Sequence, residues 1–312
     1  MPPDPLWSIG ELAEHAGVTV KTVRFYSDRG LLPEARRSSG GHRRYGPEAL
    51  DRLRLIRSLR ALDLPVSDVG RIIDQEDALE DAVAGRLREL GSQLAALRWR
   101  EAALQLIRDC TAEERTDRLR LIGAVAAPPS TDALARFWRR LLPARLPGRL
   151  RGAIIEAAVP QPPADPTPDQ VLTFARLHAL TSGVPLDIDI RRPEFRCPDE
   201  GCHPAVLYDG LGEAYALASA DLRSLRPPQE GDALDCFVAA HARSAGLRDS
   251  PAFRRRLRGV LAVTADPLVD RYWQLAAELT APASGPPEPT LGCAHDWLRA
   301  ALDTQLAGVE GL

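Results

Sequence analysis

The chain has 312 residues, of which 45% are apolar and 27% are charged. This length accommodates two domains, and this apolar content is enough to form buried cores. The 40 basic and 43 acidic side chains nearly balance at a net charge of −3, so the overall charge indicates neither a nucleic acid nor a membrane as the partner.

The charge is unevenly distributed along the chain. Residues 20–60 hold eleven basic and four acidic side chains, a local charge of +7 that leaves −10 for the remainder. Such asymmetry predicts a basic, anion-binding module joined to an acidic remainder. Nearly all the basic side chains are arginine, which favours bidentate contacts with phosphate and guanine, although a GC-rich genome produces the same bias.

Signals for membranes and for export are missing from the sequence. There is no apolar run of about 18 residues, and the first ten residues lack the basic start and apolar stretch of a signal peptide. We therefore expect a cytoplasmic protein without a membrane partner. The five cysteines are an odd, scattered set, which does not indicate a disulfide framework.

Two short helices are predicted at the N-terminus. Ser8 precedes Glu11 by three residues, the spacing of a capping box, so a helix is expected to begin here and to continue to about residue 15. Gly17 ends that helix, and Thr19 then caps a second one over residues 20–29. The two helices are therefore joined by a tight glycine turn.

The second helix has one apolar and one basic face. Val20 and Val23 are expected to face inward, while Lys21, Arg24 and Asp28 share another face at the spacing i, i+3, i+7. A basic face at the start of a helix suits a recognition helix, whose first residues enter the major groove of DNA. Taken alone, the same pattern also describes a solvated charged face.

The next stretch, residues 30–50, predicts a basic hairpin. Gly40 and Gly41 permit a tight turn, and Pro47 fits the first position of the following helix. The turn is flanked by four arginines, which a hairpin would gather at one tip: Arg36, Arg37, Arg43 and Arg44. This pattern indicates a wing beside a helix-turn-helix that binds DNA phosphates.

Residues 7–73 resemble the MerR family of bacterial transcription regulators. Three segments carry the resemblance in the family's order and spacing: TVRFYSDRGLL, GHRRY and LRALDLPVSDVGRII. The resemblance implies a winged helix-turn-helix with these DNA-contacting residues: Lys21, Arg24, Tyr26, Arg36, Arg37, Arg43, Arg44 and Tyr45. Among them, Arg24 is expected at base edges or nearby phosphates. One departure is His42, where the family usually has an aromatic ring, and it bears on the packing of the wing more than on DNA contact.

Between about residues 77 and 107, apolar residues recur at alternating steps of four and three, interrupted at Glu101. This is the spacing of a coiled-coil seam, and its members are Val83, Leu87, Leu90, Leu94, Leu97 and Leu104. A helix packed on its own domain would show the same spacing, but the resemblance places an antiparallel dimerisation helix here. We therefore expect a homodimer that binds a pseudo-palindromic element in double-stranded promoter DNA, one half-site per subunit.

The resemblance also implies a mechanism. Family members bind promoters with a long spacer and, when the effector is bound, bend and untwist the DNA so that RNA polymerase can use both promoter elements. Deformation energy is then the regulated quantity, and RNA polymerase is an expected partner. Activation and repression both stay open.

Residues after about 126 lie outside the shared region. Proline clusters divide them into blocks, most with helical periodicity, so we expect an all-helical effector domain. Only residues 185–192 alternate like a strand, and one strand makes no sheet. The predicted fold is mainly α with a small β wing, divided into a DNA-binding domain (1–74), a dimerisation helix (75–112) and an effector domain (126–312).

A cluster of cysteine and histidine stands out in this half. CPDEGCH places Cys197, Cys202 and His203 in a loop-like segment, and CFVAAH adds Cys236 and His241. A tetrahedral zinc site built from Cys197, Cys202, His203 and Cys236 is one interpretation, although the first spacing is wider than the commonest one. The alternatives are an ordinary loop with two free thiols, or a thiol redox switch. Cys236, on an amphipathic helix, fits a core better than a ligand set.

The C-terminal half also holds most of the aromatic residues. They are Phe137, Trp138, Phe174, Tyr208, Tyr215, Phe237, Tyr272, Trp273 and Trp297. Core packing explains most of them, but some could line a pocket for an apolar organic ligand. The acidic charge of this half is compatible with a cationic ligand.

We therefore hypothesise a dimeric transcription regulator whose effector is a small organic molecule. The alternatives are a metal-responsive or redox-responsive regulator, a DNA binder without a ligand, and a zinc enzyme fused to a DNA-binding module. No HExxH, GxSxG, Walker or GxGxxG pattern occurs, so no enzyme activity is expected.

Overall fold

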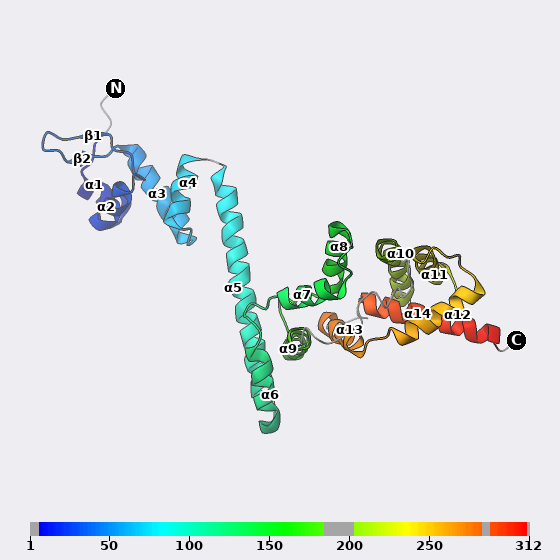
Figure 1. The fold of residues 1–312 in the computed structure, drawn as a ribbon. Helices are drawn as coiled ribbons and strands as arrows, with labels where there is room; N and C mark the ends of the chain where they lie inside the picture. The colour runs from blue at the N-terminus through cyan, green and yellow to red at the C-terminus, as the bar shows by residue number, and fades with distance from the viewer. Residues whose placement is uncertain (1–5, 76, 184–202, 283–287, 311–312) are drawn as a thin grey trace. The chain divides into compact units, whose positions relative to one another are not determined.

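The computed structural model describes residues 6–75, 77–183, 203–282 and 288–310 (Figure 1). The chain forms two compact units, Met1–Gln93 and Leu94–Leu312. The boundary between them along the chain falls within the long helix α5 (Ala78–Arg108). The described part is mainly α-helical, and its one sheet has two strands, as predicted. No helix in that part is both long and apolar enough to cross a membrane.

The N-terminal unit contains the predicted helix-turn-helix and wing. Before α5 its elements are α1 (Ile9–Ala16), α2 (Val20–Asp28), β1 (Arg36–Arg37), β2 (Arg43–Arg44), α3 (Pro47–Ala61) and α4 (Val66–Asp74). The predicted capping box is present, because the Glu11 amide donates to Ser8 Oγ at 3.3 Å while the Ser8 amide donates to the Glu11 carboxylate at 2.6 Å. Gly17 ends α1 with φ +63°, a left-handed conformation that favours glycine.

The wing is joined to the start of the chain through Tyr45. Trp7 and Tyr45 exchange two backbone hydrogen bonds of 2.8 and 2.9 Å, which fasten the strand end beside α1. The core of this unit draws on α1 to α4, the first turns of α5 and the segments between them, and it includes Leu12, Val23 and Leu53. Val20 was expected to face inward with Val23, but Val20 is 40% exposed. The inward prediction was therefore wrong for the first residue of α2.

The C-terminal unit is helical throughout its described part. After α5 its helices are α6 (Ala112–Gly123), α7 (Asp132–Leu141), α8 (Gly148–Ala158), α9 (Pro168–Ser182), α10 (Pro204–Arg223), α11 (Asp232–Ser244), α12 (Pro251–Val263), α13 (Pro267–Thr280) and α14 (Leu291–Glu310). The strand-like stretch with Leu186, Ile188 and Ile190 lies outside the described residues.

Two hydrophobic clusters organise this unit. The first joins the second half of α5 to α7, α9 and α13, around Phe137, Phe174 and Tyr272. The second joins α10, α11, α12 and α14, around Leu234 and Phe237. Figure 1 shows these helices as two neighbouring groups within the unit. Most of the aromatic residues in the sequence are therefore core residues.

Candidate DNA-binding interface and effector cavity

The start of α2 presents the side chains expected of a recognition helix. Lys21 and Arg24 are exposed, and neither takes part in an ion pair among the described residues. Phe25 is 40% exposed on the same helix, and the guanidinium of Arg29 lies 3.6 Å from the centre of its ring. This contact between Phe25 and Arg29 was not predicted from the sequence, although residues at i and i+4 of a helix lie close enough to form it.

The wing divides its four arginines between two faces. Arg36 pairs with Arg44 and Arg37 with Arg43 across the antiparallel strands. Because successive side chains of a strand point to opposite sides, each register pair shares one face. All four arginines flank the turn, two on each face, and the gathering of their guanidinium groups at one tip stays a prediction. Arg36 and Arg37 are exposed, while Arg43 and Arg44 are half-buried.

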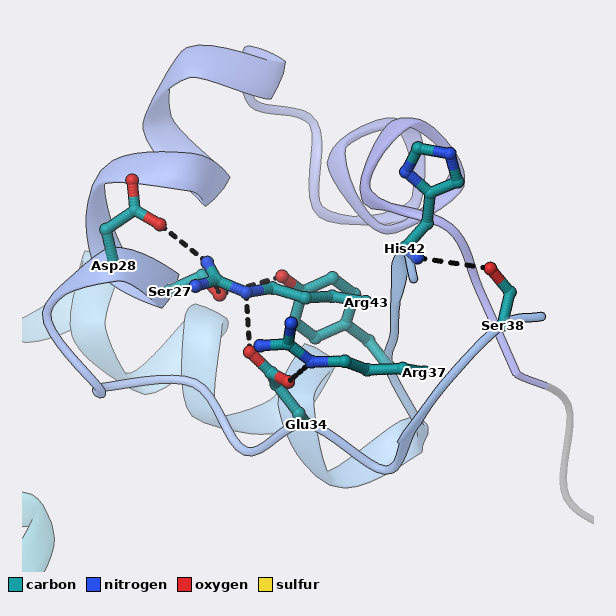
Figure 2. Close-up of polar contacts among 8 residues, drawn as sticks. Ser27, Asp28, Glu34, Arg37, Ser38, His42 and Arg43 are labelled. Atoms are coloured by element: carbon teal, nitrogen blue, oxygen red, sulfur yellow. Dashed lines mark hydrogen bonds and ion pairs between the residues drawn. The ribbon is translucent and has the colours of Figure 1, made fainter. Parts of the chain in front are cut away.

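Arg43 ties the wing to the end of α2. Figure 2 shows its guanidinium group between the carboxylates of Asp28 and Glu34. Its Nη1 lies 2.6 Å from an Asp28 oxygen and also donates to Ser27 Oγ at 3.0 Å. The hydrogen bond to Asp28 and the nearby carboxylates raise the pKa of Arg43. Glu34 also pairs with Arg37 at 3.3 Å, so one acid holds both arginines of that face.

The two tyrosines predicted to contact the DNA backbone are buried. Tyr45 has no exposed surface, and its hydroxyl lies 2.7 Å from the Ser27 hydroxyl. Tyr26 is 9% exposed and belongs to the same core. This placement gives Tyr45 a structural role beneath the wing, and direct contact with DNA stays a prediction for both rings.

His42 and Arg44 complete the wing. The His42 amide donates to Ser38 Oγ at 3.2 Å, and Figure 2 shows its imidazole directed away from the Arg43 network. The departure from the usual aromatic residue therefore leaves that network intact. Arg44 Nη1 lies 3.8 Å from the Glu11 carboxylate. Three of the four wing arginines thus have an acidic partner in the protein, and Arg36 has none among the described residues.

The predicted seam lies on an uncovered face of α5. The exposed fractions of its six members lie between 37% and 71% in the single chain: Val83, Leu87, Leu90, Leu94, Leu97 and Leu104. Another face of the same helix buries Trp99, Ala103 and Leu106 in the first hydrophobic cluster. The seam is therefore not the face with which α5 packs on its own unit, which favours a partner helix.

A cavity of about 400 Å³ lies in the C-terminal unit, between the two hydrophobic clusters. Its walls come from α7, α8 and α10 to α14. Four aromatic residues named in the sequence analysis line it: Trp138, Tyr208, Tyr215 and Trp273. The Tyr215 hydroxyl lies 3.1 Å from His295 Nδ1 on α14. A volume of this size accommodates a small organic molecule.

The candidate zinc ligands are only partly described. Cys197 and Cys202 lie outside the described residues, and His203 precedes the first turn of α10. Cys236 packs against the second hydrophobic cluster, where burial and the Glu213 carboxylate raise the pKa of its thiol. A raised pKa disfavours the thiolate that metal binding and redox chemistry require. No group of three or more potential ligands occurs among the described residues, so zinc stays a prediction.

Known proteins match the N-terminal part of the chain. Residues 7–76 match the family model described as MerR HTH family regulatory protein. The nodulation protein NolA of Bradyrhizobium sp. (strain NC92) is 34% identical over 137 residues, which cover 44% of this chain and 55% of NolA. The chain thus spans about half the length of that relative.

A second relative is matched over nearly its whole length. The HTH-type transcriptional regulator ZntR homolog of Haemophilus influenzae is 30% identical over 121 residues, covering 36% of this chain and 90% of that protein. Among solved structures, the chain is similar to the transcription regulator PbrR691 from Ralstonia metallidurans CH34, whose crystal structure is in complex with lead(II). The two sequences are 34% identical, the match covers 34% of this chain and 89% of the PbrR691 chain, and the TM-score is 0.31. Because the family model matches residues 7–76 and the ZntR homolog is matched at 30% identity over 90% of its length, the chain belongs to the MerR family of transcription regulators.

Proposed function

We propose that this chain is a homodimeric, effector-responsive transcription regulator that acts in the cytoplasm. Two copies pair along the α5 seam, and their N-terminal units bind a pseudo-palindromic promoter element. A small organic molecule in the cavity changes how the promoter is presented to RNA polymerase. The observation that carries the effector part is the cavity of about 400 Å³, which lies in the C-terminal unit, beyond the region matched by the family model.

The DNA-binding part rests on the division of basic side chains. Lys21 and Arg24 stand exposed at the start of α2, whereas Arg43 is held by Asp28 and Glu34. We therefore assign direct DNA contact first to α2 and to Arg36. Arg43 and Tyr45 position the wing against α2.

Operator binding tests this assignment. An operator is selected from a random duplex library with the wild-type protein, and affinity is measured by fluorescence anisotropy at several salt concentrations. Arg24→Ala should cost about 1 to 3 kcal/mol and alter the selected sequence, while Lys21→Ala should lower the salt slope by about one. Arg255→Ala, which removes an exposed arginine of α12, is the control and should change neither. Unchanged binding by both α2 variants would contradict the interface.

A steric block of the cavity tests the effector part. Gly212 of α10 lines the cavity, and a Cβ atom there would meet no heavy atom within 4 Å. Gly212→Leu should therefore place its side chain in the cavity and abolish the response of in vitro transcription to an active compound. Gly259→Leu on α12 is the matched control, because it also has open space around it and lies outside the cavity.

The outcomes of the block separate two cases. A compound response that survives Gly212→Leu would place the effector elsewhere. Promoter output that no compound in a diverse library alters would favour a DNA binder without an effector.

A further inference from the structure

We infer that the cavity takes an organic cation, with an apolar and preferably aromatic body and a protonated amine or quaternary ammonium group. This inference rests on the proposed function, because it names the chemical class of the effector. The observation that supports it is that the buried walls of the cavity are apolar, while acidic side chains line its exposed side.

The walls of the cavity are apolar and come from both hydrophobic clusters. Trp138 and Val269 belong to the first cluster, and Leu207, Leu211 and Leu261 to the second. All five side chains are buried. Such walls favour an apolar ligand body, because removing apolar surface from water is favourable.

The exposed lining residues that carry a charge are all acidic. Asp209 of α10, Asp270 of α13 and Asp296 of α14 are exposed and line the same cavity from three helices. None of the three takes part in an ion pair among the described residues. A fourth lining carboxylate, Asp266, accepts the Leu268 amide at 2.9 Å and so caps α13. The cavity thus has unpaired negative charge at its solvent-exposed side.

The carboxylates influence each other across the cavity. Burial and the negative charge of Asp270 raise the pKa of Asp296, and Arg299 acts in the opposite direction. Arg299 is the one arginine among the lining residues, which include no lysine. A bound cation would offset the repulsion between Asp270 and Asp296, whereas an anion would meet four lining carboxylates.

The aromatic lining suits a cation as well as an apolar body. Trp273 is half-buried, and its ring lies 5.1 Å from that of Trp138. Gly292 leaves room for Trp273, since a Cβ atom at residue 292 would lie 2.2 Å from Trp273 Cγ. A cation over the face of a tryptophan is attracted by the ring quadrupole more strongly than over tyrosine or phenylalanine.

A metal ion is a poorer occupant than an organic cation. The cavity also contains His241 and His295, but no group of three or more potential ligands is assembled there among the described residues. An organic cation needs no such coordination shell, because its charge is satisfied by dispersed carboxylates and its body by the apolar walls.

The experiment compares three probes that share a ring system and differ in charge. Isothermal titration calorimetry of the full chain at low ionic strength uses 2-naphthylmethylamine, 2-naphthylmethanol and 2-naphthoate. We expect the amine to bind about ten-fold more tightly than the alcohol, because each exposed ion pair contributes about two- to five-fold. The naphthoate should bind most weakly, and the preference for the amine should shrink as salt rises.

Variants then assign the charge preference to named carboxylates. Asp270→Asn and Asp296→Asn should each weaken amine binding by about two- to five-fold and leave alcohol binding unchanged. Asp303→Asn on α14 is the matched control, because Asp303 is exposed and lies outside the cavity. Gly212→Leu should abolish binding of amine and alcohol alike.

The outcomes distinguish the inference from the proposed function. Equal or tighter binding of the alcohol or the naphthoate, blocked by Gly212→Leu, would overturn the cationic class and keep the cavity as an effector site. Binding of no probe, or amine binding that survives both Gly212→Leu and the aspartate variants, would overturn the assignment of a cation to this cavity. A transcriptional response to another compound that Gly212→Leu blocks would still support the proposed function.

Discussion

In the N-terminal unit the exposed start of α2 carries Lys21 and Arg24, whereas in the C-terminal unit the exposed lining of the cavity carries Asp209, Asp270 and Asp296. Both sets stand outside the ion pairs among the described residues. The wing arginines differ from both, because Arg43 is neutralised within the protein. Unpaired charge therefore marks the surfaces where each unit is proposed to meet a partner.

This contrast gives the uneven charge of the chain a physical meaning. Residues 20–60 carry +7, whereas residues 1–19 and 61–93 together carry −8 and residues 94–312 carry −2, so the basic charge is concentrated in the helix-turn-helix and wing. The basic field suits a phosphate backbone, which dominates the affinity for DNA. In the C-terminal unit the negative charge that suits a cation is local to the cavity, where Asp209, Asp270 and Asp296 line it.

The largest effect is expected at the seam, which both units share. Leu87→Glu with Leu94→Glu should abolish the dimer, because each charge buried without a partner costs about 3 kcal/mol or more. Leu87 and Leu94 are 64% and 49% exposed in the single chain, so each copy should keep its fold. Sedimentation equilibrium measures the dissociation constant.

Ser92→Glu is the control for the seam. Ser92 is exposed and lies about 180° around the helix from the seam. A double glutamate variant that stays dimeric would refute the seam. The single variants Leu87→Glu and Leu94→Glu compare how much each unit's part of the seam contributes to the dimer affinity.

The next effect separates the stabilities of the two units. Gly292→Ala forces a Cβ atom to within 2.2 Å of Trp273, so it should destabilise the C-terminal unit by about 1 to 3 kcal/mol. Urea unfolding followed by tryptophan fluorescence reports mainly on this unit, which holds four of the five tryptophans. Gly308→Ala on the same helix has open space around it and should be neutral or stabilising. Equal stability of the two variants would argue against the close contact.

A smaller effect is expected beneath the wing. Tyr45→Phe removes the hydroxyl that lies 2.7 Å from Ser27 Oγ, which should cost about 1 kcal/mol in the N-terminal unit. Hydrogen exchange of α2 peptides measures the loss. Tyr26→Phe is the control, since its hydroxyl has no hydrogen bond among the described residues. If Tyr26 contacts a phosphate, its variant should weaken operator binding without faster exchange.

The smallest effect concerns pH. The hydrogen bonds of its capping box lower the pKa of Glu11, with the Ser8 amide as the main cause, and Thr111 does the same for Glu114 of α6. A lowered pKa in the folded state means that each carboxylate stabilises its helix at neutral pH and loses this contribution as the pH falls below about 4.5. Glu11→Gln and Glu114→Gln should each flatten the acid side of the stability profile in its own unit. An unaltered acid profile would count against the boxes.

Sequence reasoning succeeded where the signals are local. Ser8 and Glu11 are three residues apart, and Gly17 and Thr19 punctuate the two helices that follow. The wing could be predicted because its signal consists only of a turn and the residues on either side of it. The burial of Tyr45 was not predicted, because it depends on contact with Ser27, which lies on another element, α2.

The cavity could not be predicted, because its lining is brought together by tertiary packing. Asp209, Asp270 and Asp296 lie far apart in the chain, and two of the helices that line the cavity, α8 and α10, have weak helical signals in the sequence. Both helices contain two glycines, which lower helix propensity. Gly210 is required by packing, since a Cβ atom there would lie 2.7 Å from Ala240 Cβ. A glycine required by tertiary packing does not contribute to the hydrophobic periodicity from which helices are predicted.

Helix α5 joins two equilibria that are usually measured apart. Leu97 is exposed on the seam, while Trp99, two residues later, is buried in the cluster that also supplies Trp138 and Val269 to the cavity. Thermodynamic linkage is reciprocal, so any factor by which a cavity ligand changes the dimer affinity equals the factor by which dimerisation changes the ligand affinity. If the proposed dimer and ligand are coupled through this cluster, the dissociation constant of the dimer should shift with ligand concentration in the absence of DNA.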